Sequence, residues 1–123
     1  VIAASRVVYT ANLGDSRVYR YTRGALTQLT RDHRFALGGR HELYQYLGAS
    51  DEDTEISSTI GKIDRVAGER LLLCTDGVSG KLTDEELAAL LPAHPDAGEA
   101  ATAILDAVRE TATDNATVLV VNL

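Results

Sequence analysis

The chain has 123 residues, of which 45% are hydrophobic and 24% charged, so it forms one globular domain or part of one, not two. Twelve Lys and Arg against eighteen Asp and Glu give a net charge of −6, which disfavours nucleic acid as a partner because binding its phosphate backbone requires a basic face. A single cysteine excludes an internal disulfide. No apolar run is long enough to cross a membrane, so we expect no membrane partner and a cytoplasmic location.

The N-terminus is unusual because the sequence contains no methionine and begins in a stretch with the composition of a strand. These features favour the back part of a longer gene product over a short protein that has lost its initiator. On that interpretation, an upstream segment supplies residues that this chain lacks.

The first 30 residues have the pattern of three antiparallel strands. Turn-forming residues at 12–16 and the pair Arg23-Gly24 separate runs of β-branched and aromatic residues. We therefore expect the first two strands to form a hairpin and all three to form a meander. The predicted strands occupy residues 7–11, 17–21 and 26–30.

The next segment, residues 31–54, has no clean hydrophobic period. We expect a loop there, with one short helix near residues 43–47. The acidic cluster at 51–53 fits a solvated loop surface better than a metal site. A further strand is predicted at 56–63.

The C-terminal half alternates strands and helices. The apolar run at 71–74 predicts a buried central strand, in which Cys74 acts as a small hydrophobic residue. Thr83 and Glu86 have the spacing of a capping box at the start of a helix. Together with the N-terminal strands, these elements predict an α+β fold with mostly antiparallel sheet. The expected helices span 84–91 and 97–111, and the last strand spans 116–121.

Three carboxylates stand at strand ends beside Gly or Asn: Asp15, Asp76 and Asp114. If the strands at 71–75 and 116–121 are antiparallel neighbours, Asp76 and Asp114 lie at the same edge of the sheet. Converging carboxylates repel one another unless a cation neutralises them, and Mg²⁺ or Mn²⁺ takes such oxygen ligands. The alternative interpretation is that each Asp is an ordinary turn residue.

Four segments resemble, in the same order, motifs of the metal-dependent Ser/Thr protein phosphatases of the phosphatase 2C class. Any one match is weak, but four ordered matches across nearly the whole chain are specific. The family motifs are AN-GDSR, L-x-Q-L-T-x-D-H, LLLCSDGL and a terminal DN-x-TV. The matching segments here are ANLGDSR at 11–17, LTQLTRDH at 26–33, LLLCTDGV at 71–78 and DNATV at 114–118.

The resemblance implies a function and a metal site. It implies hydrolysis of phosphoserine or phosphothreonine in proteins by a water that bridges two Mn²⁺ or Mg²⁺ ions. Asp76 and Asp114 would bind the metal pair, and Asp15 would share a further, weaker ion with Asp76. The implied fold is part of a four-layer sandwich of two antiparallel β-sheets flanked by helices.

Two departures from the family pattern qualify this expectation. The family's front half is absent, with its phosphate-binding Arg and the DG-x-GG motif whose Asp bridges both metals, so we expect residues 1–123 to be the C-terminal portion of such a domain. The segment from 33 to 47 is short compared with the family's flap beside the substrate cleft. Arg34, Arg40 and His41 lie there, and we expect them to be solvated loop residues rather than phosphate contacts.

The missing half also predicts a partner for the chain, because a lone back half would leave sheet edges and an apolar face open. The partner would be the chain's own front half, a second copy or a companion subunit. Two other interpretations of function stay open beside the phosphatase. They are a catalytically inactive phosphatase-like module that binds or regulates a partner, and a small α+β domain with polar turns.

Overall fold

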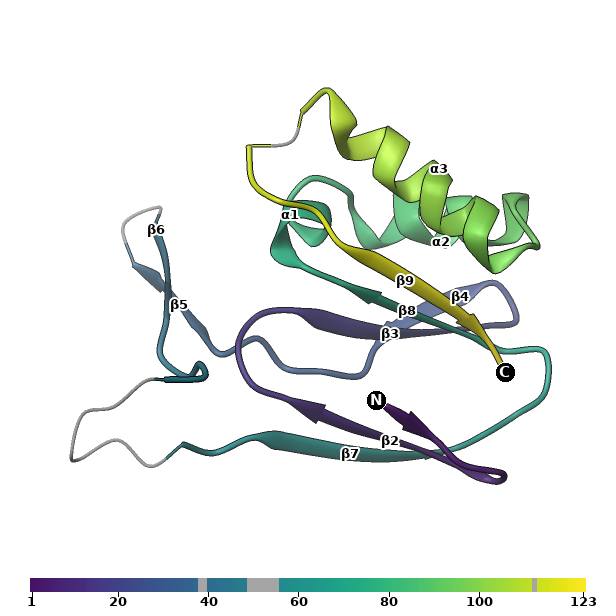
Figure 1. Ribbon diagram of the computed structural model, residues 1–123, viewed down its shortest axis with the longest axis horizontal. Coiled ribbons are helices and arrows are strands. Elements are labelled where there is room, and N and C mark those ends of the chain that lie inside the picture. The colour runs from purple at the N-terminus through teal and green to yellow at the C-terminus, as the bar shows by residue number, and fades with distance from the viewer. Residues whose placement is uncertain (38–39, 49–55, 112) are drawn as a thin grey trace.

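The computed structural model describes residues 1–37, 40–48, 56–111 and 113–123. Two β-sheets are stacked on each other, and helices cover the outer face of one of them (Figure 1). Sheet A has the strand order β1-β2-β7, with β1 at Ile2–Ala3, β2 at Val7–Asn12 and β7 at Thr59–Asp64. Sheet B has the order β4-β3-β8-β9, with β3 at Arg17–Thr22, β4 at Ala25–Gln28, β8 at Arg70–Cys74 and β9 at Val118–Asn122.

All strand pairs in the two sheets are antiparallel. The helices are α1 at Asp76–Ser79, α2 at Asp84–Ala93 and α3 at Ala97–Arg109. The expectation of an α+β chain with antiparallel sheets and flanking helices is therefore confirmed. In the part of the chain that the structure describes, no helix combines the length and the apolar character needed to cross a bilayer.

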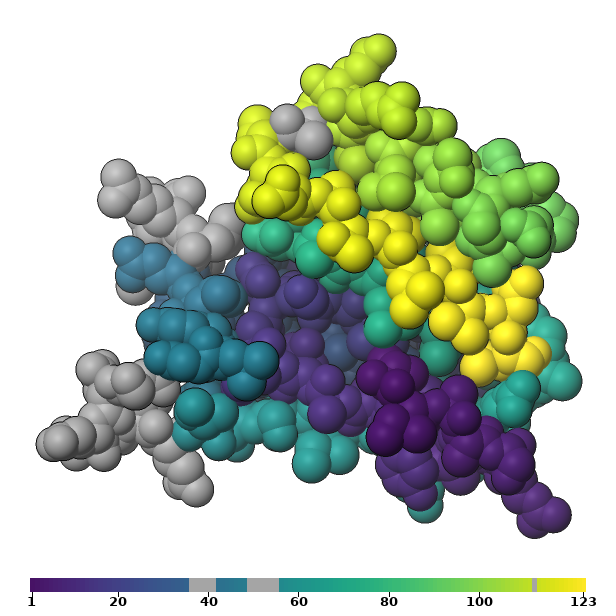
Figure 2. All heavy atoms as spheres, viewed as in Figure 1, coloured from purple at the N-terminus to yellow at the C-terminus, as the bar shows by residue number. Residues whose placement is uncertain are grey.

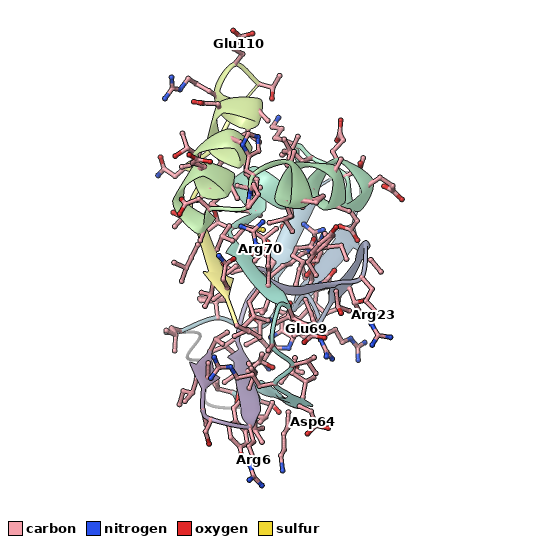
Figure 3. All side chains as sticks on the ribbon, turned by 90° about the vertical axis from the view of Figure 1, so that its right-hand side faces the viewer. Arg6, Arg23, Asp64, Glu69, Arg70 and Glu110 are labelled. Carbon is pink, nitrogen blue, oxygen red and sulfur yellow. The ribbon has the colours of Figure 1, made fainter. Side chains whose placement is uncertain are left out.

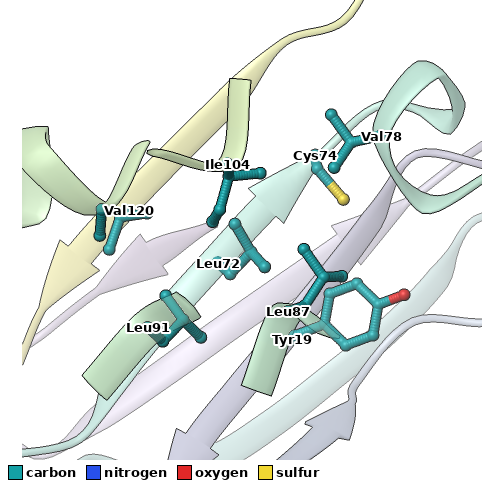
Figure 4. Close-up of a cluster of buried hydrophobic side chains, with 9 residues drawn as sticks. Tyr19, Leu72, Cys74, Val78, Leu87, Leu91, Ile104 and Val120 are labelled. Carbon is teal, nitrogen blue, oxygen red and sulfur yellow. The ribbon is translucent and has the colours of Figure 1, made fainter. Parts of the chain in front are cut away.

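The main hydrophobic core lies between sheet B and the helices, where Tyr19, Leu72 and Val120 meet Leu87 and Ile104 (Figure 4). Helix α3 contributes a buried stripe of Ala100, Ile104 and Val108, spaced four residues apart on one face. Because β8 is buried on both faces, it reads as a continuous apolar run and not as an alternating one.

The predicted hairpin between the first two strands is wrong, because β2 and β3 belong to different sheets. β2 pairs with β1 and β7, whereas β3 pairs with β4 and β8. Both strands carry apolar residues, such as Val8 and Val18, which are buried. Since β2 and β3 lie in different sheets, residues 13–16 cross from sheet A to sheet B. The turn at Arg23-Gly24 does form a hairpin, with both residues at positive φ, as a two-residue type I′ turn requires.

The short helix expected near 43–47 is also wrong. A separate hairpin of β5 (Arg34–Leu37) and β6 (Arg40–Leu43) lies beside the two sheets (Figure 1). Leu43 pairs with Arg34, and the next amide, of Tyr44, donates to the carbonyl of His33. These cross-strand bonds use the backbone groups that a helix would need. The acidic cluster at 51–53 lies outside the described residues.

The start of α2 is as predicted: the Thr83 hydroxyl accepts from the Glu86 amide, and the Glu86 carboxylate accepts from the Thr83 amide. The helix runs past Pro92 to Ala93 instead of ending at Leu91. Pro92 cannot donate to the carbonyl of Ala88, so one backbone bond is lost near the end of the helix. The carbonyl of Leu91, in the last turn, accepts from Arg70.

Two buried charged residues stand next to each other where β8 begins, and Figure 3 labels both. Arg70 extends to the helices and donates to the carbonyls of Leu91 and His94. Glu69 forms an ion pair of 2.5 Å with Arg20 of β3. This strand therefore has a charged anchor to the end of α2 and another to its neighbour in sheet B.

Candidate metal centre

Asp15 and Asp76 approach each other because of the register between β3 and β8. Arg17 pairs with Cys74 at the ends of these strands. Asp15 lies in the turn just before β3, and Asp76 begins α1 just after β8, so both residues stand at the same end of this strand pair. Burial of the Asp15 carboxylate and the negative charge of Asp76 raise the pKa of Asp15 above its ordinary value. A cation bound near Asp15 and Asp76 would offset this concentration of negative charge.

Asp114 lies at the same end of sheet B as Asp76. The condition on which this placement depends is met: β8 and β9 are antiparallel neighbours, with Cys74 opposite Val118. Beyond them the Thr75 amide donates to the Thr117 carbonyl at 3.2 Å, and the Thr117 amide donates to the Thr75 hydroxyl at 3.0 Å. Asp114 itself is exposed, and its carboxylate accepts from the Asn115 amide at 2.7 Å.

The three carboxylates do not form a closed ligand cluster. Within the described ranges, no group of three or more His, Cys, Asp or Glu side chains is close enough to hold a metal ion. The structure thus brings Asp15 and Asp76 together and leaves Asp114 nearby but separate.

The donor set at this end of the sheet fits a hard divalent cation in its chemistry. The side chains that converge are carboxylates, which Mg²⁺ and Mn²⁺ prefer over sulfur ligands. Cys74 is unsuited to bind metal, because burial raises the pKa of its thiol to about 11 and keeps it neutral. Two or three carboxylates supply only part of a coordination shell, so the remaining ligands would be waters or groups from outside this chain.

A cluster of two arginines around Asp32 adjoins the site, and the sequence analysis did not predict it. Arg17 donates to both oxygens of Asp32, at 2.8 and 3.0 Å, and Nε of Arg34 lies 3.1 Å from the same carboxylate. Burial of Asp32 opposes its ionisation, but the hydrogen bonds and charges of Arg17 and Arg34 outweigh burial and lower its pKa. The charge of Arg34 also acts on Asp15 and favours its ionised form.

Arg34 is therefore half-buried and ion-paired, and is not a solvated loop residue as expected. Arg17 could have been singled out from the sequence, because it is a charged residue at the start of a strand that turns out to be central. Its partner Asp32 is 15 residues away and is found only once the fold is known. The structure places Arg40 and His41 in β6.

We compared the chain with protein families, curated proteins and solved structures. No family model matches the sequence. The serine/threonine protein phosphatase PstP of Mycobacterium tuberculosis is 29% identical to this chain over 136 residues. The alignment covers all of this chain but only 26% of PstP, so the chain spans about a quarter of the length of that curated relative.

Solved structures show the same relationship. The crystal structure of M. tuberculosis PstP/Ppp has a TM-score of 0.85 and 28% identity, over 99% of this chain and 57% of that one. The catalytic domain of PstP in complex with two manganese ions has a TM-score of 0.82 and 30% identity, over 98% of this chain and 55% of that one. The phosphatase MsPP of Mycobacterium smegmatis, in complex with cacodylate, has a TM-score of 0.79 and 26% identity, over 94% of this chain and 55% of that one.

These comparisons confirm the resemblance to metal-dependent Ser/Thr protein phosphatases of the phosphatase 2C class. The chain is related to part of such a phosphatase, and that part is a little over half of a solved catalytic domain.

Proposed function

We propose that the protein to which this chain belongs hydrolyses phosphoserine and phosphothreonine in proteins, with Mn²⁺ or Mg²⁺ as its cofactor. The observation that carries the proposal is the opposed pair Asp15 and Asp76, held at one end of sheet B by the register of β3 and β8. The two manganese ions in the PstP catalytic domain support a divalent cofactor.

Each carboxylate has a stated part in this proposal. Asp76 and Asp114 would bind the metal pair from the two sides of the β8–β9 junction, and Asp15 would share a further ion with Asp76. When bound, divalent cations supply Lewis-acid activation of the attacking water and neutralise charge on the phosphate. The chain's own contribution is to fix the carboxylates in place, through the strand register and the close approach of Gly77 to Asn115.

We further propose that residues 1–123 are the C-terminal portion of a phosphatase 2C-like domain and pair with their own front half. An apolar cavity of about 340 Å³ lies between the two sheets, and its lining includes Val1, Ala11, Leu73 and Leu119. Figure 2 shows the N-terminal residues, in dark purple, beside the C-terminal residues, in yellow, on this face of the molecule. A sandwich interior is normally filled by side chains from both sheets, so this cavity supports the proposal of a further element that docks here.

Exposed apolar residues support the same proposal. Leu119 is 53% exposed on β9, and Ile60 is 74% exposed on β7. β9 is the last strand of sheet B, and it carries neither a charged residue nor a proline to protect that edge. Because the solved relatives are nearly twice as long as the part that matches, we propose an upstream segment as the occupant, rather than a second copy or a companion subunit.

The experiment that tests the function is Mn²⁺-dependent release of phosphate from a phosphothreonine peptide, by this chain alone and by the chain joined to its upstream segment. We expect activity only in the joined protein, and we expect Asp76→Asn to abolish it. Asp106→Asn, an isosteric change on the exposed side of α3, is the matched control and should keep full activity. A joined protein that binds no Mn²⁺ and releases no phosphate would instead support the inactive binding module.

A further inference from the structure

His33 is buried, with 4% of its surface exposed, and both of its ring nitrogens have partners. Nδ1 lies 3.3 Å from the backbone nitrogen of Gly14, and Nε2 lies 2.9 Å from the hydroxyl of Thr59. A backbone N–H only donates, so Nδ1 must accept and therefore carries no proton. These partners assign the neutral tautomer with hydrogen on Nε2, which donates to Thr59.

The turn that carries Asp15 depends on these contacts. Besides donating to the ring of His33, Gly14 accepts from the His33 backbone amide at 3.0 Å and from the side chain of Asn12 at 3.2 Å. Gly14 adopts a φ of 106°, and a methyl group placed on it would meet nothing within 4 Å. The hydrogen bonds of Gly14 therefore fix this turn, and its positive φ explains why a glycine stands there.

Thr59, the partner of Nε2, is the first residue of β7 and pairs directly with Asn12 at the end of β2, so it joins the ring to sheet A. On its other side the ring of His33 packs against Tyr44, with 5.7 Å between ring centroids, and the amide of Tyr44 donates to the His33 carbonyl. His33 therefore joins three parts of the molecule at one point: the turn before Asp15, sheet A and the base of the β5–β6 hairpin.

We propose that His33 is a positioning residue for the metal centre, which holds the Gly14–Asp15 turn so that the Asp15 carboxylate faces Asp76. The inference rests on the proposed function, because the proposed function is what makes Asp15 a metal ligand. His33 does not touch the metal or the substrate in this role. It acts through the hydrogen bond that its Nδ1 accepts from Gly14.

Two conservative variants separate the contacts of the ring. In His33→Asn, the amide oxygen occupies the position of Nδ1 along the side chain and accepts from Gly14, while the bond to Thr59 is lost. In His33→Gln, the longer side chain reaches Thr59 but leaves the Gly14 amide without its partner. Since groups that orient a metal ligand typically contribute about 10-fold or more to affinity, we expect His33→Gln to weaken Mn²⁺ binding by at least about 10-fold. We expect His33→Asn to restore most of that affinity.

The measurements are made on the protein joined to its upstream segment, by calorimetric titration with Mn²⁺ and by hydrogen exchange of the Gly14 amide without metal. The ¹⁵N shifts of the His33 ring report its tautomer directly. Equal Mn²⁺ affinities and equal Gly14 protection in the two variants would overturn the positioning role, as would a proton on Nδ1. If the wild type binds no Mn²⁺, the proposed function fails and this role fails with it. Wild-type binding with no difference between the variants overturns this inference alone.

Discussion

Gly77 lies so close to the carbonyl oxygen of Asn115 that a methyl group on Gly77 would overlap that oxygen. The contact joins the residue after Asp76 to the residue after Asp114. It is a backbone contact, so neither residue can move aside by changing a side-chain rotamer. The separation between the two proposed metal-binding segments is therefore set by the absence of a side chain at position 77.

Gly77→Ala is expected to force these two segments apart. The overlap with backbone should lower the free energy of unfolding by about 1–3 kcal/mol, the usual range for overpacking. Thermal or urea unfolding measures the change, and Mn²⁺ affinity should fall in parallel. Gly98→Ala in the first turn of α3 is the control, because its added methyl meets only the Asp96 side chain, at 3.2 Å. Equal effects of the two substitutions would contradict the interpretation.

Arg70 provides a second test, because it neutralises the carbonyl end of α2. Its guanidinium donates to the carbonyls of Leu91 and His94 and to the side chain of Asn122. Arg70→Met should lower the free energy of unfolding by about 2–4 kcal/mol, because buried carbonyls lose their donors. The exposed Arg109, which forms an ion pair with Asp106, is the control, and Arg109→Met should change stability by less than about 0.5 kcal/mol. Chemical denaturation of both variants compares the two positions.

The sequence was sufficient to predict features that depend on local chemistry or on one strand pair. The capping box at Thr83, the hairpin turn at Arg23-Gly24 and the buried central strand at 71–74 are examples. The residues that determine each of these features lie close together in the sequence. A short, continuous apolar run is typical of a central strand that is buried on both faces.

The features that sequence could not predict depend on which sheet a strand joins. Turn residues at 12–16 fit a hairpin and a crossover between sheets equally well, since both need a residue such as Gly14 at positive φ. Asp32, the carboxylate partner of Arg17, and the hydrogen-bond partners of the His33 ring likewise come from segments at least 15 residues away. The family resemblance implied that Asp15 and Asp76 share an ion, but the pairing of β3 with β8, which brings them to the same end of sheet B, is seen only in the fold.

The opposition of Asp15 and Asp76 predicts contrary effects of one substitution with and without metal. In metal-free protein, Asp76→Asn should raise the midpoint of thermal unfolding, because it removes a negative charge facing Asp15. With Mn²⁺ at about 100 times its dissociation constant, the wild type should gain about 2.7 kcal/mol, and the variant should gain little. Thermal unfolding with EDTA and with Mn²⁺ measures both effects. A variant destabilised under both conditions would show that Asp76 is structural.

The ion pair between Glu69 and Arg20 should contribute to acid unfolding. The hydrogen bond from Arg20 lowers the pKa of the nearly buried Glu69 carboxylate. The ion pair therefore contributes its full stability above the pKa that Glu69 has in the unfolded chain, about 4.3. This contribution is lost as the pH falls through the lower pKa that Glu69 has in the folded protein. The difference in unfolding free energy between wild type and Glu69→Gln should be largest near pH 6 and shrink below about pH 4. Glu110→Gln, at the exposed end of α3, should give no such trend.

The open face of β9 should make the chain self-associate when its front half is absent. Leu119 is half-exposed and lines the cavity between the sheets, and no charged residue interrupts β9. For residues 1–123 alone, we expect oligomers whose size increases with concentration in sedimentation velocity. Leu119→Lys should shift the population toward monomer, because a charge at an open strand opposes pairing with another chain. Ala89→Lys adds the same charge to the exposed face of α2 and should leave the oligomers unchanged. A chain that stays monomeric without the substitution would show that the face needs no partner, and would remove the main physical argument for a docked front half.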